Sequence, residues 1–270
     1  MKLAFIGGGN MASALIAGLS QKHFDMRDIT VIEPDAEKRA MLQNTYGVHA
    51  CEALVDATSS DVIVLAIKPQ QMAEVCYSLA LLLKGQLVIS IAAGIRMADL
   101  SRWLGGYQTI IRAMPNTPAQ IQAGVTGLFA MPGISATHQN YADQVLKAAG
   151  DTVWVSDEVQ LDAITAISGS GPAYVFYFIE ALQEAAVALG LTEAAAKQLS
   201  LATFKGASLL ASSVETPVTI LRAQVTSKGG TTEQGILSME QQQVKQAIIA
   251  AAHKACDRAK TLGDELGGTA

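Results

Sequence analysis

The chain has 270 residues, of which half are hydrophobic and 16% are charged, and its formal net charge is −5. This length and apolar content suffice for one large domain or two ordinary ones, and they exclude a predominantly disordered chain. No block of Lys or Arg stands out, which argues against a nucleic-acid or anionic-membrane partner. Small phosphate-bearing molecules are not excluded, because they need only local hydrogen-bond donors.

The N-terminal apolar run, Met1–Ile6, is too short for a signal peptide, and nowhere do eighteen apolar residues follow one another. We therefore expect a cytoplasmic protein with no membrane partner. The three cysteines are widely spaced with no CxxC, and the four histidines stand alone, with no two of them paired at ligand spacing. This spacing predicts reduced thiols, no disulfide framework, no metal site and no catalytic histidine.

The first part of the chain alternates short apolar runs with helical patterns. Strands are predicted at Leu3–Ile6, Ile29–Ile32, Val62–Ile67, Leu87–Ile91, Thr109–Ala113, Thr126–Ala130 and Thr152–Val155. Helices are predicted at Met11–Lys22, Asp35–Tyr46, Gln70–Leu83, Met97–Leu104 and Ala136–Ala149. Several strand runs are continuous in Val, Ile and Leu, as expected of strands covered on both faces. The alternation indicates an α/β fold with a doubly wound parallel sheet, a Rossmann-like dinucleotide-binding domain, over residues 1–155.

After residue 155 the strand patterns stop, which indicates an all-α domain over residues 156–270. Helices are predicted at Asp157–Ile167, Pro172–Leu189, Glu193–Ser212, Pro217–Val225 and Thr232–Leu262. Thr192 is predicted to be the N-cap of the helix that begins at Glu193. Thr216 is predicted to be the N-cap of the next helix, with Pro217 at its first position. These helices are rich in Ala and Leu, and a domain of this size can hardly bury them alone. We therefore expect a homodimer through the C-terminal helices.

A glycine loop joins the first predicted strand to the first helix. Its sequence, Gly7-Gly8-Gly9-Asn10-Met11-Ala12, fits the G-x-G-x-x-A fingerprint of nicotinamide dinucleotide sites, and its place between strand and helix supports the match. Glu33 ends the second strand, where an acidic side chain would bind the adenine ribose hydroxyls and repel a 2′-phosphate. Lys38 and Arg39 follow closely and could compensate, so the choice between NADH and NADPH stays open on these residues.

Further loops follow later strands and should meet at the same edge of the sheet, because parallel strands all end there. They are Ala66-Ile67-Lys68-Pro69, Ile91-Ala92-Ala93-Gly94 and Met114-Pro115-Asn116-Thr117-Pro118. Lys68 could face a phosphate or the substrate, or it could be a solvated loop lysine. Asn116, held between two prolines, could hydrogen-bond the carboxamide or the substrate, or simply cap a turn.

A second glycine loop lies near the C-terminus. The stretch Thr226-Ser227-Lys228-Gly229-Gly230-Thr231-Thr232 places two glycines and four hydroxyl side chains before a predicted helix. Thr231 with Gln234 fits a capping box. Backbone N–H groups that converge at a helix N-terminus favour a small carboxylate or phosphate. An ordinary Gly-Gly turn between two helices is the alternative.

These motifs together resemble the Δ1-pyrroline-5-carboxylate reductase family over essentially the whole chain. The resemblance is carried by the opening Phe5–Met11, by the loops Ala66–Pro69, Ser90–Gly94, Arg112–Pro118 and Ser168–Tyr174, and most specifically by Val225–Thr232. It implies a Rossmann domain followed by a helical dimerisation domain. It also implies NADPH-dependent (NADH possible) reduction of 1-pyrroline-5-carboxylate to L-proline, the last step of proline biosynthesis, in a dimer that is often part of a larger ring.

The resemblance also assigns site residues by position. It implies that the substrate carboxylate is held by Ser227, Gly229, Gly230, Thr231 and Thr232, and that Thr232 is the catalytic residue that hydrogen-bonds the ring nitrogen. The cofactor-binding residues expected from the loops are Gly7, Gly8, Gly9, Asn10, Met11, Glu33, Ala66, Ile67, Lys68, Pro69, Ala92, Ala93, Gly94 and Asn116. Two positions depart from the family pattern. Lys228 stands where many members have proline, and Glu33 stands where NADPH-preferring members often have a small hydroxyl residue.

Two other functions fit the sequence less well. A β-hydroxyacid dehydrogenase would carry a catalytic lysine four residues after a Gly-x-Gly at the start of a long helix, but Val175 follows Gly169-Ser170-Gly171 at that spacing. A non-catalytic dinucleotide-sensing protein would not need the Gly-Gly-Thr-Thr loop. A protonated cyclic imine is already electrophilic, so its reduction needs orientation more than a strong acid, and the lack of a catalytic histidine or carboxylate dyad is consistent with this chemistry.

Overall fold

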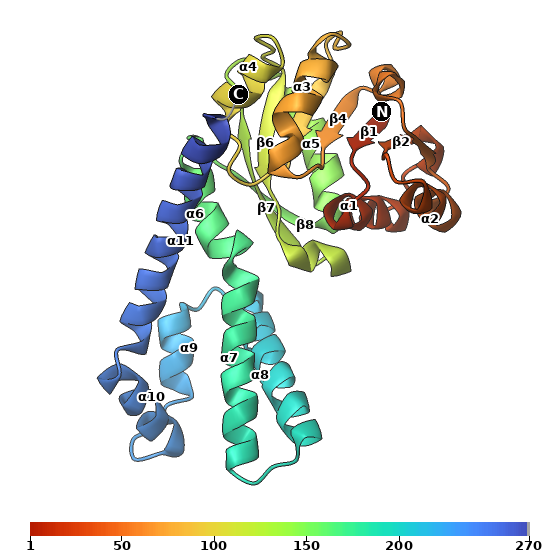
Figure 1. Ribbon diagram of the computed structural model, residues 1–270. Coiled ribbons are helices and arrows are strands. Elements are labelled where there is room, and N and C mark those ends of the chain that lie inside the picture. Colours follow the sequence, from red (N-terminus) through yellow and green to blue (C-terminus); the bar gives the residue numbers. More distant parts are fainter. Residues whose placement is uncertain (269–270) are drawn as a thin grey trace. The chain divides into compact units, whose positions relative to one another are not determined.

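The structure is a computed structural model that describes residues 1–268, and it divides into two compact units (Figure 1). One unit contains Met1–Ser170 together with the chain from Lys254 onward, and the other contains Gly171–His253. This division differs from the expected domains 1–155 and 156–270, because the segments on either side of Gly171–His253 pack with the sheet.

The first unit is built on an eight-stranded sheet in the order β3-β2-β1-β4-β5-β6-β7-β8. The strands are β1 Leu3–Ile6, β2 Ile29–Ile32, β3 His49–Cys51, β4 Val62–Leu65, β5 Leu87–Ser90, β6 Ile110–Met114, β7 Gly124–Ala130 and β8 Gly150–Trp154. All seven predicted strands are present within a few residues of their expected bounds. β3 was missed, because three residues are too few for a periodic pattern.

Neighbouring strands are parallel except for β6 and β7, which pair antiparallel. The expectation of a wholly parallel sheet is therefore wrong at this pair. The connection from β6 to β7 holds only the short 3₁₀ helix η4, Thr117–Ile121. A parallel connection needs a crossover of a dozen residues or more, whereas antiparallel strands can be joined by a short one.

Alternate residues of the strands supply two hydrophobic cores, one on each face of the sheet. On β1, Leu3 and Phe5 join one core, and Ala4 and Ile6 join the other. Residues of α1 Asn10–Gln21, α2 Ala36–Tyr46 and α5 Ala136–Leu146 belong to the first core, and residues of α3 Met72–Ala80 and α4 Met97–Trp103 belong to the second. Short 3₁₀ helices complete the connections: η1 Met26–Asp28, η2 Leu54–Ser59, η3 Pro69–Gln71 and η5 Lys147–Ala149.

The segment after β8 is tied to the sheet by a buried arginine of β6. It forms α6, Gln160–Ile164, followed by a π-helical turn, Thr165–Gly169. Arg112 is 4% exposed, and its Nη1 donates to Glu158 Oε1 at 2.8 Å, with Asp162 at 3.9 Å from its Nη2. The same Glu158 oxygen accepts from the Met97 N–H at 2.7 Å. Burial raises the pKa of Asp162, and the charge of Arg112 opposes that shift.

The end of the chain packs on the same unit through α11, Val244–Gly267. Arg96, which precedes α4, pairs with Asp264 at 2.7 Å and donates to the Lys260 carbonyl. Arg102 donates to the Gly267 carbonyl at 2.7 Å. These contacts explain why the last residues group with the sheet rather than with the other helices.

The second unit is helical, with α7 Gly171–Ala188, α8 Glu193–Ser213, α9 Val218–Gln224, α10 Thr231–Gln241 and the beginning of α11. The Thr192 N-cap is confirmed, since its hydroxyl accepts from the Ala195 N–H. The Thr216 cap is wrong: Pro217 keeps an extended ψ of 140° and is itself the N-cap residue. The single helix predicted over Thr232–Leu262 is also wrong, because Gln243 adopts a left-handed φ of 55° and separates α10 from α11.

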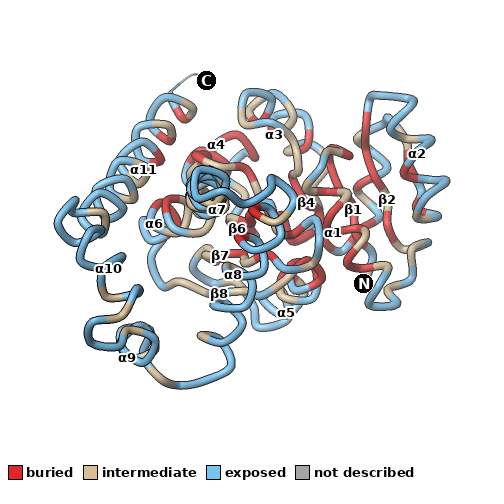
Figure 2. Tube along the Cα trace, turned by 90° about the horizontal axis from the view of Figure 1, so that it is seen from below, coloured by how far each residue is buried: buried red, intermediate tan, exposed pale blue. Residues whose placement is uncertain are grey.

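This helical unit leaves most of its apolar surface exposed in the single chain (Figure 2). None of the residues of α7 is buried, and Tyr177 and Leu189 are 71% and 85% exposed. Across residues 1–268, no helix combines the length and the hydropathy that a bilayer-spanning segment needs. Apolar area of this extent is typical of a protein interface.

Candidate active site

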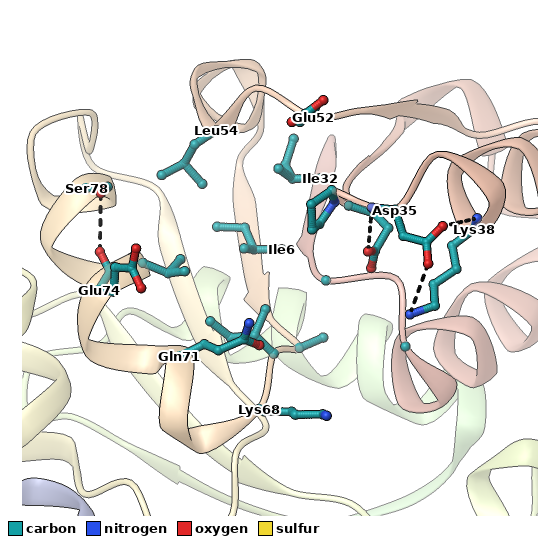
Figure 3. A pocket seen from close by; sticks show the side chains of 17 residues that line it. Ile6, Ile32, Asp35, Lys38, Glu52, Leu54, Lys68, Gln71, Glu74 and Ser78 are labelled. Carbon is teal, nitrogen blue, oxygen red and sulfur yellow. Dashed lines mark hydrogen bonds and ion pairs between the residues drawn. The ribbon is translucent and has the colours of Figure 1, made fainter.

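A cleft of about 580 Å³ opens where β1, β2 and β4 end (Figure 3). In open α/β sheets, ligands bind in the crevice beyond the carboxyl ends of the strands. The glycine loop and the end of β2 supply one wall, and the loop after β4 with α3 supplies the other. Figure 3 shows the apolar side chains Ile6, Ile32 and Leu54 between these walls, with the Asp35–Lys38 pair on one side and Gln71 and Glu74 on the other.

The backbone of the glycine loop fits a dinucleotide. Gly7 has a left-handed φ of 98°, and a Cβ at this position would lie 2.6 Å from the Ala66 carbonyl oxygen, so only glycine fits here. Gly9 is the N-cap of α1 and lines the cleft, and a Cβ at Gly9 would meet nothing within 4 Å. Ala12 is fully buried, as the fingerprint requires of its small third residue. The first N–H groups of a helix have no acceptor within it, so the start of α1 can bind a pyrophosphate.

Glu33 is held in place at the end of β2. It is 7% exposed, and its Oε2 accepts from the Gly8 N–H at 2.8 Å while its Oε1 accepts from the Asp35 N–H at 3.0 Å. The Gly8 N–H is therefore already used and cannot serve the pyrophosphate. Glu33 instead presents a fixed negative charge to the cleft.

The two basic residues near Glu33 are also engaged. Lys38 Nζ lies 3.9 Å from the Asp35 carboxylate, which caps α2 (Figure 3). Arg39 Nη1 donates to the carbonyls of Glu33 and Pro34, both at 2.7 Å. Because of these contacts, Lys38 and Arg39 offset less of the negative charge of Glu33.

The loop after β4 contributes Ala66, Ile67 and Lys68 to the cleft. Lys68 is exposed, and its ammonium group makes no ion pair with any residue in the described part of the chain. It is therefore available to a phosphate. Pro69 begins the following η3 turn. Asn10 and Met11, the first two residues of α1, lie outside the lining of this cleft.

The remaining predicted cofactor residues lie at neighbouring strand ends and do not line this cleft. Ala92, Ala93 and Gly94 follow β5, where Gly94 has a φ of 77° and a Cβ would approach Leu262 to 3.0 Å. The side chain of Asn116 connects two other segments of the chain. Its Oδ1 accepts from the Val125 N–H at 2.9 Å, and its Nδ2 donates to the Ser168 carbonyl at 3.1 Å. One N–H of the Asn116 amide remains for another partner.

The C-terminal glycine loop forms the start of α10. Gly229 has a left-handed φ of 74°, Gly230 is the N-cap, and Thr231 and Thr232 are the first two helical residues and are exposed. The Gly230 N–H donates to the Ser227 carbonyl at 3.0 Å, which closes the loop. The predicted capping box of Thr231 with Gln234 is wrong, because the helix begins one residue earlier than that box requires.

Glu233 takes the place that the predicted capping box gave to Gln234. Its Oε2 accepts from the Gly229 N–H at 2.7 Å. Sequence reasoning missed this residue, although its position three residues after the Gly230 cap is the usual one for such an acidic partner. The cleft residues Glu52 and Leu54 were missed for another reason, since they follow the unpredicted strand β3.

Comparisons with known proteins cover both the sheet-forming and the helical parts of the chain. Residues 158–262 match the family model described as pyrroline-5-carboxylate reductase dimerisation, and residues 2–94 match that of NADP oxidoreductase, coenzyme F420-dependent. The chain is 42% identical to a pyrroline-5-carboxylate reductase of Pseudomonas aeruginosa, over 97% of this chain and 98% of that protein.

Solved structures show the same similarity. A pyrroline-5-carboxylate reductase from Coxiella burnetii has a TM-score of 0.92 and 42% identity, covering 97% of this chain and 98% of that one. The Plasmodium falciparum enzyme, solved with NADP bound, has a TM-score of 0.87 and 30% identity, with the same coverage. Prephenate dehydrogenase from Aquifex aeolicus, at 12% identity and a TM-score of 0.55, shares the fold alone.

Proposed function

The chain belongs to the pyrroline-5-carboxylate reductase family, and we propose that it reduces 1-pyrroline-5-carboxylate to L-proline with NADPH, the last step of proline biosynthesis. The observation that carries this proposal is the similarity over 97% of the chain. Both glycine loops lie in segments that match the family models. NADPH supplies the hydride when it is bound, and NADH is a possible alternative donor.

We assign cofactor binding to the loops at the strand ends. The backbone N–H groups at the start of α1 bind the pyrophosphate, and the open face of Gly9 allows its close approach. Glu33 faces the adenosine ribose, and Lys68 offers a positive charge to a phosphate. Ala92, Ala93, Gly94 and Asn116 would serve the nicotinamide end.

We assign substrate binding to the start of α10. The substrate carboxylate is bound by the hydroxyl groups of Ser227, Thr231 and Thr232 and by the backbone N–H groups of the loop at the positive end of the helix. The Gly229 N–H is held by Glu233 and the Gly230 N–H by the Ser227 carbonyl, so neither of these two predicted donors is free. The hydroxyl groups and the remaining N–H groups at the start of α10 carry the anion. This fixes the orientation of the ring, which a protonated imine needs more than acid catalysis.

Thr232 is the residue that we expect to contact the reacting group. Its hydroxyl accepts a hydrogen bond from the protonated ring nitrogen, which holds the imine in the charged, electrophilic form. After hydride addition the nitrogen keeps that proton as a neutral secondary amine. It then takes up a second proton from water, which Thr232 can relay.

We further propose a homodimer formed through the C-terminal helices, with a larger ring as a possible assembly of dimers. The match of residues 158–262 to a dimerisation model and the exposed apolar side chains of α7 and α8 support it. A cytoplasmic location remains our expectation.

The test is a turnover assay of the purified protein. The oxidation of NADPH and of NADH is measured with and without pyrroline-5-carboxylate. Oxidation that depends on the imine establishes the reductase. Binding of the cofactor without any turnover would instead favour a dinucleotide-sensing protein.

A further inference from the structure

We propose that His49, Cys51 and Asp56 form a binding site for a zinc-class divalent metal ion at the edge of the sheet. One ligand atom from each residue, a ring nitrogen, the thiol sulfur and a carboxylate oxygen, lies within 4.8 Å of the others. The spacing of these residues along the chain gave no sign of a metal site. Their convergence is a product of the fold.

The edge strand β3 and the η2 turn bring the three donors together. Residues two apart on a strand point to the same side, so His49 and Cys51 share one face while Ala50 between them is buried in the opposite core. The chain then turns into η2, whose Ala57 is fully buried and anchors the turn. Asp56, directly before this anchor, is thereby held next to the two strand residues.

The donor set suits a borderline metal ion. Imidazole, thiolate and carboxylate are all common ligands of Zn²⁺, and three protein ligands leave one tetrahedral position for water. His49 and Asp56 are exposed and Cys51 is half-buried, so an ion can reach the site from solvent. Coordination exchanges the thiol proton of Cys51 for a bond to the metal, and the proton passes to water, with no change of oxidation state.

The charges around the three residues are compatible with a cation. Among the described residues, no Lys or Arg pairs with the Asp56 carboxylate. One basic group near the site, Arg39, is engaged with Glu52 at 3.8 Å and with the carbonyls of Glu33 and Pro34.

The site also adjoins the dinucleotide cleft. The Cys51 carbonyl accepts from the Glu33 N–H at 2.9 Å, and Glu52 and Leu54, next in sequence, line the cleft. A bound ion would therefore hold in place the segment that carries Glu52 and Leu54. The metal site itself does not depend on the proposed reductase activity.

Cobalt binding to the full-length protein tests the proposal directly. The chelator-treated protein is titrated with Co²⁺ alone, and the near-ultraviolet thiolate-to-cobalt charge-transfer band is recorded. We expect a saturable band at one Co²⁺ per chain that Zn²⁺ abolishes by displacement. Cys51→Ser should remove the band. His49→Ala and Asp56→Asn should weaken Co²⁺ binding by at least about tenfold, since even outer partners of a metal site contribute roughly 10–100-fold.

The matched control replaces another histidine and cysteine of the same chain. The His253→Ala, Cys256→Ser variant changes an exposed imidazole and a half-buried thiol of α11, and it should keep the full band. Because His49 and Asp56 are exposed, their variants should have the same melting temperature as the unaltered protein in the absence of metal. The proposal is overturned if no charge-transfer band forms, if the band survives Cys51→Ser, or if His49→Ala and Asp56→Asn bind Co²⁺ unchanged.

Discussion

The Glu33 carboxylate accepts the backbone N–H of Gly8 at 2.8 Å, which ties the end of β2 to the middle of the glycine loop. The same carboxylate also accepts from the Asp35 N–H. These two hydrogen bonds fix the position of the side chain at the end of β2. Under the proposed binding mode, this carboxylate faces the adenosine ribose, where a 2′-phosphate would meet it.

Replacing this carboxylate should shift the cofactor preference. In Glu33→Gln the charge is lost while an amide oxygen can still accept from Gly8. We expect the ratio of kcat/KM for NADPH to that for NADH to rise about tenfold or more, which corresponds to roughly 1.4 kcal/mol. Initial rates with both cofactors at saturating imine measure the ratio. An unchanged ratio would show that Glu33 does not face the ribose, and Glu37→Gln, on the exposed start of α2, is the matched control.

Two glycines of the same loop should respond differently to alanine. Gly7→Ala places a Cβ against the Ala66 carbonyl in a left-handed backbone, which costs roughly 1–2 kcal/mol for the conformation alone, so the melting temperature should fall. Gly9→Ala meets no protein atom and should leave stability unchanged. It should nevertheless weaken dinucleotide binding, because its methyl group occupies the approach to the pyrophosphate. Calorimetry and cofactor titration separate the two effects, and full cofactor affinity in Gly9→Ala would contradict this role for the loop.

The hydroxyl group of Thr232 should matter for turnover rather than for folding. Thr232 is exposed at the start of α10, so Thr232→Ala should keep its stability. A lost hydrogen bond to a charged group costs roughly 1.5–3 kcal/mol, so kcat/KM should fall by about one to two powers of ten. Thr232→Ser restores the hydroxyl and should recover most of the activity. Equal kcat/KM in the alanine variant and the unaltered enzyme would remove Thr232 from the mechanism.

Loss of Arg112 should destabilise the first unit. The buried Arg112 side chain pairs with Glu158 and Asp162, so Arg112→Leu leaves two partly buried carboxyl groups without their cation. Breaking a buried pair costs about 3–5 kcal/mol, and we expect the lower end because Glu158 is 24% exposed. Urea denaturation measures the free energy of unfolding. Arg27→Leu removes an exposed ion pair with Asp25 and should change little, so similar losses in both variants would argue against the burial effect.

Cys76 should be protected from thiol reagents while the protein is folded. It is fully buried in α3, and burial raises its pKa to about 12. The folded pKa lies above the ordinary value of 9.0, so this thiol contributes stability that is present below about pH 9 and lost as the pH rises toward 12. Near neutral pH, Cys76 should therefore react only as fast as the protein unfolds. Mass-spectrometric mapping of labelled peptides checks this, and rapid labelling of Cys76 at native conditions would contradict it.

Local patterns in the sequence were sufficient for most elements of the fold. Short apolar runs, several of them continuous in Val, Ile and Leu, located seven of the eight strands, and the G-x-G-x-x-A stretch located the glycine loop at the end of β1. The physical reason is that a buried strand and a tight turn impose residue types on neighbouring positions, and such constraints are readable within a few residues. Both glycine loops were recognised in this way.

Only the tertiary structure decided how distant segments meet. The antiparallel β6–β7 pair, the two backbone partners of Glu33 and the break at Gln243 left no periodic signal. The convergence of His49, Cys51 and Asp56 likewise appeared only once the edge strand β3 and the η2 turn were folded. Such contacts arise from chain packing, in which residues far apart or irregularly spaced become neighbours. The spacing of residues along the chain therefore located the loops, and the folded sheet decided which side chains share a site.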